Sequence, residues 1–160
     1  MLSRLLCLLW LVINTSAGPD TNYDACTVLS TEEIRTACGR ESLGAARRSQ
    51  ASGGHTDCRF PGGGAGDFRV TLTPHQKSAV ADFKAAPEIL QEEGKAFEAI
   101  ADVGDGAYYW EDRLQFRVGD RIVAIWVNRT PRTEPADAVK KALTHLAKLA
   151  AERLRTPPAK

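Results

Sequence analysis

The sequence predicts an α+β fold of two layers, in which helices pack on one face of a mainly antiparallel sheet. Polar and apolar residues alternate with period two in short runs between 107 and 128, which is typical of half-buried hairpin strands. An apolar 3.6-residue period follows at 134–154 and indicates an amphipathic helix. Shorter patterns precede both, and the resulting order, α-β-β-α-β-β-β-β-α, favours one sheet covered by helices.

Two segments flank the predicted domain, which we place at residues 18–155. Residues 1–17 have the pattern of a secretory signal peptide: Arg4, the apolar run 5–13 and a small-residue cleavage site. The apolar run is shorter than the ~20 residues of a spanning helix, and the residues before Cys7 make a poor lipobox. We therefore expect a secreted or periplasmic protein that touches a membrane only through its signal peptide before cleavage. Residues 156–160 are expected to form a disordered tail.

The charge balance limits the possible partners. The chain has 21 Lys and Arg against 20 Asp and Glu, and removal of the signal peptide with Arg4 leaves a neutral protein. A neutral chain argues against nucleic acid or an anionic membrane as the main partner.

The first elements of the domain are short. Ser30 and Glu33 form a capping box that begins a helix, and Gly39 ends it. Residues around 50–54 are rich in Ser, Gly and Ala, so we expect a mobile loop that carries Arg47, Arg48 and His55. Strands are predicted at 58–60 and 68–72, joined by a glycine-rich turn that lacks the features of a phosphate-binding loop.

The middle of the chain alternates helix and strand. Thr73, Pro74 and Gln76 are the expected start of a helix that buries Val80 and Phe83, and Pro87 should end or kink it. A strand is predicted at 97–101, before the turn at 103–106. A loop is expected at 128–133. The last helix has this expected apolar face: Val139, Ala142, Leu143, Leu146, Leu149 or Ala150, and Leu154.

The stretch 104–128 is the predicted centre of the fold. Residues 113–118 and 121–128 are expected to pair as a hairpin around Gly119 and Asp120, because glycine supplies the positive φ of a tight turn. Residues 107–110 should pair on the other side of 113–118, although a slip of one residue would exchange the faces of that strand.

This pairing gives the sheet two different faces. One is aliphatic and is the expected contact of the last helix; it includes Leu114, Phe116, Val123 and Ile125. The opposite face carries our candidate binding residues: Tyr108, Trp110, Arg113, Gln115, Arg117 and Trp126. Such a face can stack on sugars or planar groups, or bind a partner protein. The alternative interpretation is that the arginine stems and aromatic rings cover one another or lie beneath a further strand.

Three cysteines remain after the signal peptide. In an oxidising compartment we expect two of them to pair. We favour Cys26 and Cys58, because each lies beside an ordered element, whereas Cys38 lies within a short helix. A metal site of Cys38, His55 and Cys58 would lack a fourth ligand, so neither a metal nor a cofactor is predicted.

Three short motifs resemble a family of small bacterial exported proteins and lipoproteins of unknown function. They are the start Asp24–Ser30 (D-x-C-x-L-L-[ST] in the family), Cys58–Phe60 (C-x-[YFW]) and Gly104–Ala107 (G-D-x-A). The family is distantly similar to extracellular sensor domains of bacterial receptor kinases. The resemblance implies a Cys26–Cys58 disulfide and no established activity.

The sequence favours a non-enzymatic function. His55, His75 and His145 are scattered, and no motif of a nucleophilic or metal-dependent hydrolase is present. Our first hypothesis is therefore an exported binding or sensor-like domain whose partner is an envelope glycan or another exported protein. The alternatives are a secreted inhibitor or interaction module acting through a disulfide-tethered loop at 47–57, and a hydrolase with an unrecognised site.

Overall fold

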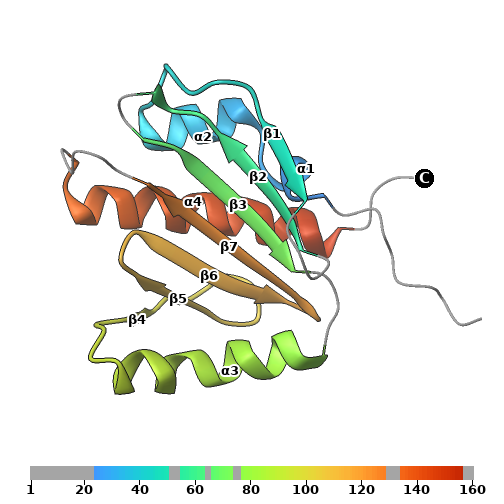
Figure 1. Cartoon of the computed structure of the whole chain (residues 1–160), viewed down its shortest axis with the longest axis vertical. Helices are drawn as coiled ribbons and strands as arrows, with labels where there is room; N and C mark the ends of the chain where they lie inside the picture. Colours follow the sequence, from blue (N-terminus) through green and yellow to red (C-terminus); the bar gives the residue numbers. More distant parts are fainter. Residues whose placement is uncertain (1–23, 51–54, 64–65, 74–76, 129–133, 157–160) are drawn as a thin grey trace, which may run out of the picture.

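The α+β class is confirmed by a computed structural model, which describes residues 24–50, 55–63, 66–73, 77–128 and 134–156. The described strands form a single seven-stranded sheet with the order β1-β2-β3-β7-β6-β5-β4, and every neighbouring pair is antiparallel (Figure 1). The strands are β1 (Arg47–Gln50), β2 (Thr56–Phe60), β3 (Phe68–Thr73), β4 (Glu98–Ala99), β5 (Ala107–Trp110), β6 (Arg113–Val118) and β7 (Arg121–Val127).

Several sequence predictions lie outside the described residues. They are the signal peptide at 1–17, most of the tail at 156–160, the capping residues Pro74 and Gln76, and much of the loops at 50–54 and 128–133.

Three helices form the layer behind the sheet in Figure 1. They are α1 (Ala25–Val28), α2 (Thr31–Cys38) and α4 (Ala136–Arg155), and α4 passes behind β3 and β7. The apolar face of α4 is buried against the aliphatic face of β6 and β7, as predicted. Its buried residues are Val139, Leu143, Leu146, Ala147, Ala150, Ala151 and Leu154. The main core therefore lies between α4 and the centre of the sheet.

Helix α3 (Lys77–Glu92) differs from the other described helices, because it packs against the opposite face of the sheet. Its Phe83 and Leu90 form a second, smaller cluster with Tyr108 of β5 and Ile122 of β7. Figure 1 shows α3 on the β4 side of the sheet, away from α1 and α2. The helices thus cover one face almost fully and the other only at one end.

Strand β1 is a correction to the sequence prediction. Residues 47–50 were expected in a loop, but they pair along β2 from Arg47 opposite Arg59 to Gln50 opposite Thr56. The tetrapeptide Arg-Arg-Ser-Gln does not alternate polar with apolar residues, so the sequence pattern did not predict a strand here. An edge strand is held mainly by backbone hydrogen bonds, which do not depend on side-chain type. The expected loop at 47–57 is therefore largely a hairpin.

Three further elements differ from expectation. Helix α3 continues through Pro87 to Glu92, so of the two predicted effects of this proline, an end or a kink, the end is wrong. The strand expected at 97–101 is shortened to Glu98–Ala99. A short helix that was not predicted, α1, precedes the first predicted helix and is capped by Asp24 through a hydrogen bond from the backbone N–H of Cys26.

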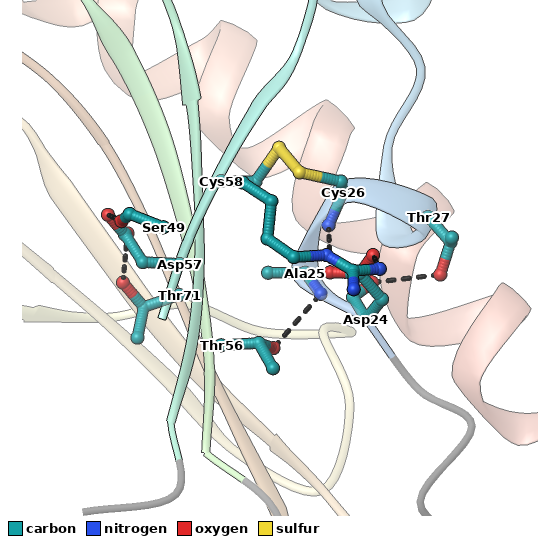
Figure 2. The surroundings of a disulfide bond; sticks show 10 residues. Asp24, Ala25, Cys26, Thr27, Ser49, Thr56, Asp57, Cys58 and Thr71 are labelled. Carbon is teal, nitrogen blue, oxygen red and sulfur yellow. Dashed lines mark hydrogen bonds and ion pairs between the residues drawn. A yellow bond between two sulfur atoms is a disulfide. The ribbon is translucent and has the colours of Figure 1, made fainter. Parts of the chain in front are cut away.

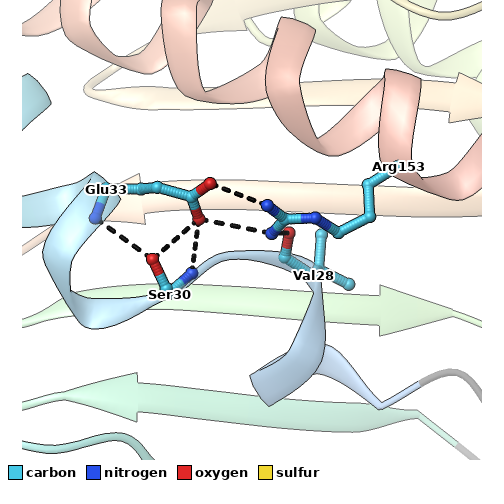
Figure 3. A network of polar contacts seen from close by, with 4 residues as sticks. All are labelled: Val28, Ser30, Glu33 and Arg153. Carbon is cyan, nitrogen blue, oxygen red and sulfur yellow. Dashed lines mark hydrogen bonds and ion pairs between the residues drawn. The ribbon is translucent and has the colours of Figure 1, made fainter.

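The capping box of α2 is confirmed and extends into a network with α4 (Figure 3). The Glu33 carboxylate accepts hydrogen bonds from the backbone N–H and the hydroxyl of Ser30 at 2.7 and 2.9 Å. The Arg153 guanidinium donates to the same carboxylate at 2.7 and 3.2 Å, and to the carbonyl oxygen of Val28. One carboxylate therefore caps α2 and joins it to α4.

We expect that Glu33→Gln makes the free energy of unfolding less sensitive to acidic pH. The hydrogen bond from Arg153 lowers the pKa of Glu33 to about 2, although partial burial opposes this shift. Because the folded-state pKa is depressed, the stabilisation is complete above the ordinary value of 4.5 and is lost as the pH falls through about 2. Glutamine keeps a cap acceptor. Since Arg153 is 45% exposed, we expect a loss of only ~1 kcal/mol at neutral pH.

Urea unfolding from pH 7 to pH 2 measures this effect. The difference between parent and Glu33→Gln should shrink below pH 4.5. Glu32→Gln is the matched control, because Glu32 is 79% exposed and meets Arg35 at 3.7 Å within the same helix. An equal pH dependence in both variants would contradict the assignment.

Candidate functional site

The predicted binding residues share the face of the sheet that is opposite to α1, α2 and α4. We call it the outer face. The register of the central meander agrees with the sequence prediction: Trp110 is opposite Arg113, and Arg113 is opposite Trp126. Tyr108 is opposite Gln115, and Arg117 is opposite Ile122. The structure therefore brings the six candidates together on one surface.

Arg113 is held between two tryptophan rings. Its guanidinium carbon lies 5.3 Å from the ring centroid of Trp110 and 4.9 Å from that of Trp126. This follows from the register, since residues directly opposite in antiparallel strands have their side chains close together. Both distances are within the range of cation–π attraction. All three side chains are half-buried, so each keeps a solvent-facing surface.

Tyr108 is a correction to the expected site, because it is buried rather than accessible. Only 4% of the residue is exposed, and its ring lies 5.0 Å from Phe83 of α3 and 5.2 Å from Trp110. Burial raises the pKa of the Tyr108 phenol to about 12. Tyr108 therefore supports the ring of Trp110 from beneath α3 and is not a contact residue. Sequence periodicity placed Tyr108 on the correct face but did not reveal that a helix covers it.

Arg117 and Gln115 occupy the part of the outer face next to α3. The Arg117 guanidinium donates to the carbonyl oxygen of Gly119 at 2.8 Å and lies 4.0 Å from the carboxylate of Asp105. Arg117 is thus engaged by the hairpin turn, whereas Gln115 is half-buried beside Tyr108. The accessible centre of the face consists of Trp110, Arg113 and Trp126.

Sequence analysis missed three arginines that extend this surface. Arg69 on β3 is opposite Trp126, Arg59 on β2 is opposite Arg69, and Arg47 on β1 is opposite Arg59. A local signal was present, because Arg59 and Arg69 alternate with the buried residues of β2 and β3. Their position beside Trp126 depends on the pairing of β3 with β7, which are far apart in the sequence.

The predicted disulfide between Cys26 and Cys58 is confirmed, with an S–S distance of 2.04 Å (Figure 2). It ties α1 to β2, and the backbone N–H of Ala25 donates to the hydroxyl of Thr56 beside it. The remaining described cysteine, Cys38, is free and half-buried. Burial raises the pKa of the Cys38 thiol to about 11, so it stays protonated and poorly nucleophilic at neutral pH.

Potential metal ligands are not gathered in the part of the chain that the structure describes. No group of three or more His, Cys, Asp or Glu residues that could hold a metal occurs among these residues. His55 contacts the hydroxyl of Thr73 at 2.9 Å, and His145 is exposed on α4. His75 lies outside the described residues. None of the helices in the described ranges is long and apolar enough to cross a membrane.

Comparison with known proteins does not assign this chain to a family or a function. Neither a family model, nor a curated protein, nor a solved structure matches this chain. The outer face is therefore interpreted from its own chemistry.

Proposed function

We propose that this protein is a non-enzymatic binding domain of the bacterial envelope, exported to the periplasm or the cell exterior, and that its outer face holds the partner. The observation that carries the proposal is Arg113, which lies between Trp110 and Trp126 on the side of the sheet away from the main core. Tryptophan and arginine are the residues most enriched at binding hot spots. The main core lies on the other side of the sheet and does not explain this arrangement. Of the two tryptophans, Trp110 packs at the edge of the smaller cluster beneath α3.

The Cys26–Cys58 disulfide supports the proposed compartment, since disulfides persist mainly in oxidising environments such as the periplasm and the cell exterior. Among the described residues, α3 is the helix that packs on the outer face, and it covers this face at the end near β5. The partner classes that suit this face are an envelope glycan and another exported protein.

We also propose that the chain belongs to the exported bacterial family suggested by its motifs, because the motif residues have structural roles that such a family would keep. Asp24 caps α1, Cys26 and Cys58 form the disulfide, and Phe60 is fully buried. Gly104 has a φ of +57°, and a Cβ there would lie 2.1 Å from the carbonyl oxygen of Arg117. These motifs therefore specify the fold and leave the outer face free to determine the partner.

The double variant Trp110→Ala/Trp126→Ala is expected to weaken binding to an insoluble cell-wall fraction by about tenfold or more, since truncation of a hot-spot tryptophan costs ≥2 kcal/mol. Co-sedimentation measures the change. The matched control is Ile89→Ala, which removes a large apolar side chain that is 48% exposed on α3. Both proteins should retain cooperative thermal melts. Unchanged sedimentation of the folded double variant would contradict the proposal.

A further inference from the structure

The outer face carries a continuous row of arginine and tryptophan side chains across six neighbouring strands. Each residue in the row is the direct partner of the next one on the adjacent strand. In order from β1 to β5, the row is Arg47, Arg59, Arg69, Trp126, Arg113 and Trp110. We call it the Arg/Trp row. Neighbouring strands lie ~4.8 Å apart, so the five steps of the row span roughly 24 Å.

The row is open to solvent along its length. Arg47 and Arg59 are exposed, and the other four members are half-buried. Helix α3 covers Tyr108 and Ile122, which belong to neighbouring rows of the outer face, and of the row itself Trp110 packs against the edge of that cluster. A small ligand is usually enclosed in a concave pocket, whereas this row lies on the surface of an open sheet. The arrangement therefore suits an extended ligand that crosses the strands.

Positive charge exceeds negative charge on this surface. Among the described strand residues, the outer face has five arginines and one carboxylate, Asp57, which accepts hydrogen bonds from Ser49 and Thr71 (Figure 2). Asp67, just before β3, forms an ion pair with Arg59 at 2.6 Å.

Two arginines of the row, Arg47 and Arg113, form no ion pair within the described residues. Arg69 forms no direct ion pair among these residues, but its charge interacts with the Asp67 carboxylate. Like charges directly opposite one another on neighbouring strands repel. Asp67 offsets part of the repulsion around Arg59 and Arg69. An anionic ligand would offset the remaining repulsion among Arg47, Arg59 and Arg69, which favours an anionic ligand over a neutral one.

We infer that the Arg/Trp row binds an anionic polysaccharide, with sugar rings over Trp110 and Trp126 and the acidic groups along the arginines. Guanidinium groups bind carboxylates and other oxyanions through paired hydrogen bonds, and tryptophan offers a flat apolar surface with a polar edge. The inference rests on the proposed function, since it names the ligand class of the same face. Single-stranded nucleic acid also combines stacking with negative charge, but the disulfide favours a ligand met outside the cytoplasm.

The test is a titration of the purified mature chain with polygalacturonate, a polymer of uronic acid, beside neutral dextran and a single-stranded DNA oligonucleotide. We expect binding of polygalacturonate that weakens as salt rises, because exposed charges are screened. Neutral dextran should bind at least tenfold more weakly. Equal affinity for dextran, or tighter row-dependent binding of DNA, would overturn the assignment to an anionic glycan.

Variants locate the site. Arg59→Gln/Arg69→Gln should weaken polygalacturonate binding at least tenfold and flatten its salt dependence, and Arg47→Gln, which breaks no ion pair among the described residues, should weaken it severalfold. The control Lys141→Gln/Lys148→Gln removes the same charge from exposed positions of α4, on the other side of the molecule, and should bind like the parent. Equal loss in the control and the row variants would overturn the inference.

The ligand class and the proposed function can be tested separately. If polygalacturonate does not bind, the inference about ligand class is wrong. Cell-wall sedimentation that still depends on Trp110 and Trp126 would then leave the proposed function standing. If cell-wall sedimentation does not depend on Trp110 and Trp126 either, both the ligand class and the proposed function are wrong.

Discussion

Replacement of Leu143 by Asp is expected to abolish cooperative folding, and Leu146→Asp should do the same. Both leucines are fully buried between α4 and the sheet. Truncation of a buried leucine alone costs ~2–5 kcal/mol, and a carboxylate without a partner in an apolar core adds several more. Since a domain of this size is stable by only ~5–15 kcal/mol, the combined loss is comparable to the whole stability.

Thermal melts by circular dichroism measure this effect. The parent should show one sharp transition, whereas the Asp variants should show none or accumulate as aggregates. Lys148→Asp is the matched control, because it places the same carboxylate on the exposed side of the same helix. A melting temperature within a few degrees of the parent for Leu143→Asp would mean that α4 does not cover the aliphatic face.

Loss of the disulfide is the second large effect that we expect. Cys26 and Cys58 are separated by 32 positions, and the loop-entropy model gives roughly 3–4 kcal/mol for closing a loop of that length. The double variant Cys26→Ala/Cys58→Ala should therefore unfold at a markedly lower denaturant concentration than the parent.

Equilibrium denaturation of the oxidised parent, the reduced parent and the double variant checks this expectation. The reduced parent and the double variant should have similar midpoints. Cys38→Ser is the control, because Cys38 is free, so reduction should affect this variant as it affects the parent. Peptide mapping without reduction should find Cys26 joined to Cys58, and a bridge from Cys38 to either residue would contradict the pairing.

The connection between the two layers explains why the outer face has a fixed shape. Val123 and Ile125 of β7 are buried against the main core, while Ala124 and Trp126, which alternate with them, face outward. Any change that loosens the core therefore also displaces the Arg/Trp row. Binding variants on the outer face should accordingly be interpreted beside their melting curves.

The central meander was predictable from sequence because its information is local. Alternation in β6 and β7, with Gly119 in the turn at a φ of +61°, fixes which side chains share a face. The same holds for the capping box of Ser30 and Glu33, which needs residues three positions apart. Sequence periodicity also identified the apolar face of α4.

Three features were not predictable from local pattern, since each depends on contacts between distant parts of the chain. Strand β1 has no apolar period and is defined by its pairing with β2. Pro87 predicted an end or a kink of the helix, and α3 does not end there because Phe83 and Leu90, on either side of the proline, pack on the sheet. Tyr108 lies on the predicted face and is buried because α3 covers it.

The sequence by itself determined the α+β class, the disulfide pair and the aromatic and basic character of one sheet face, because alternation, cysteine context and turn residues act over a few positions. Only the tertiary structure decided how far that face extends. Pairing of β3 with β7 places Arg69 beside Trp126, and pairing of β2 and β1 adds Arg59 and Arg47. Strand order in a sheet is set by burial of the whole core, a property that no local stretch of sequence encodes.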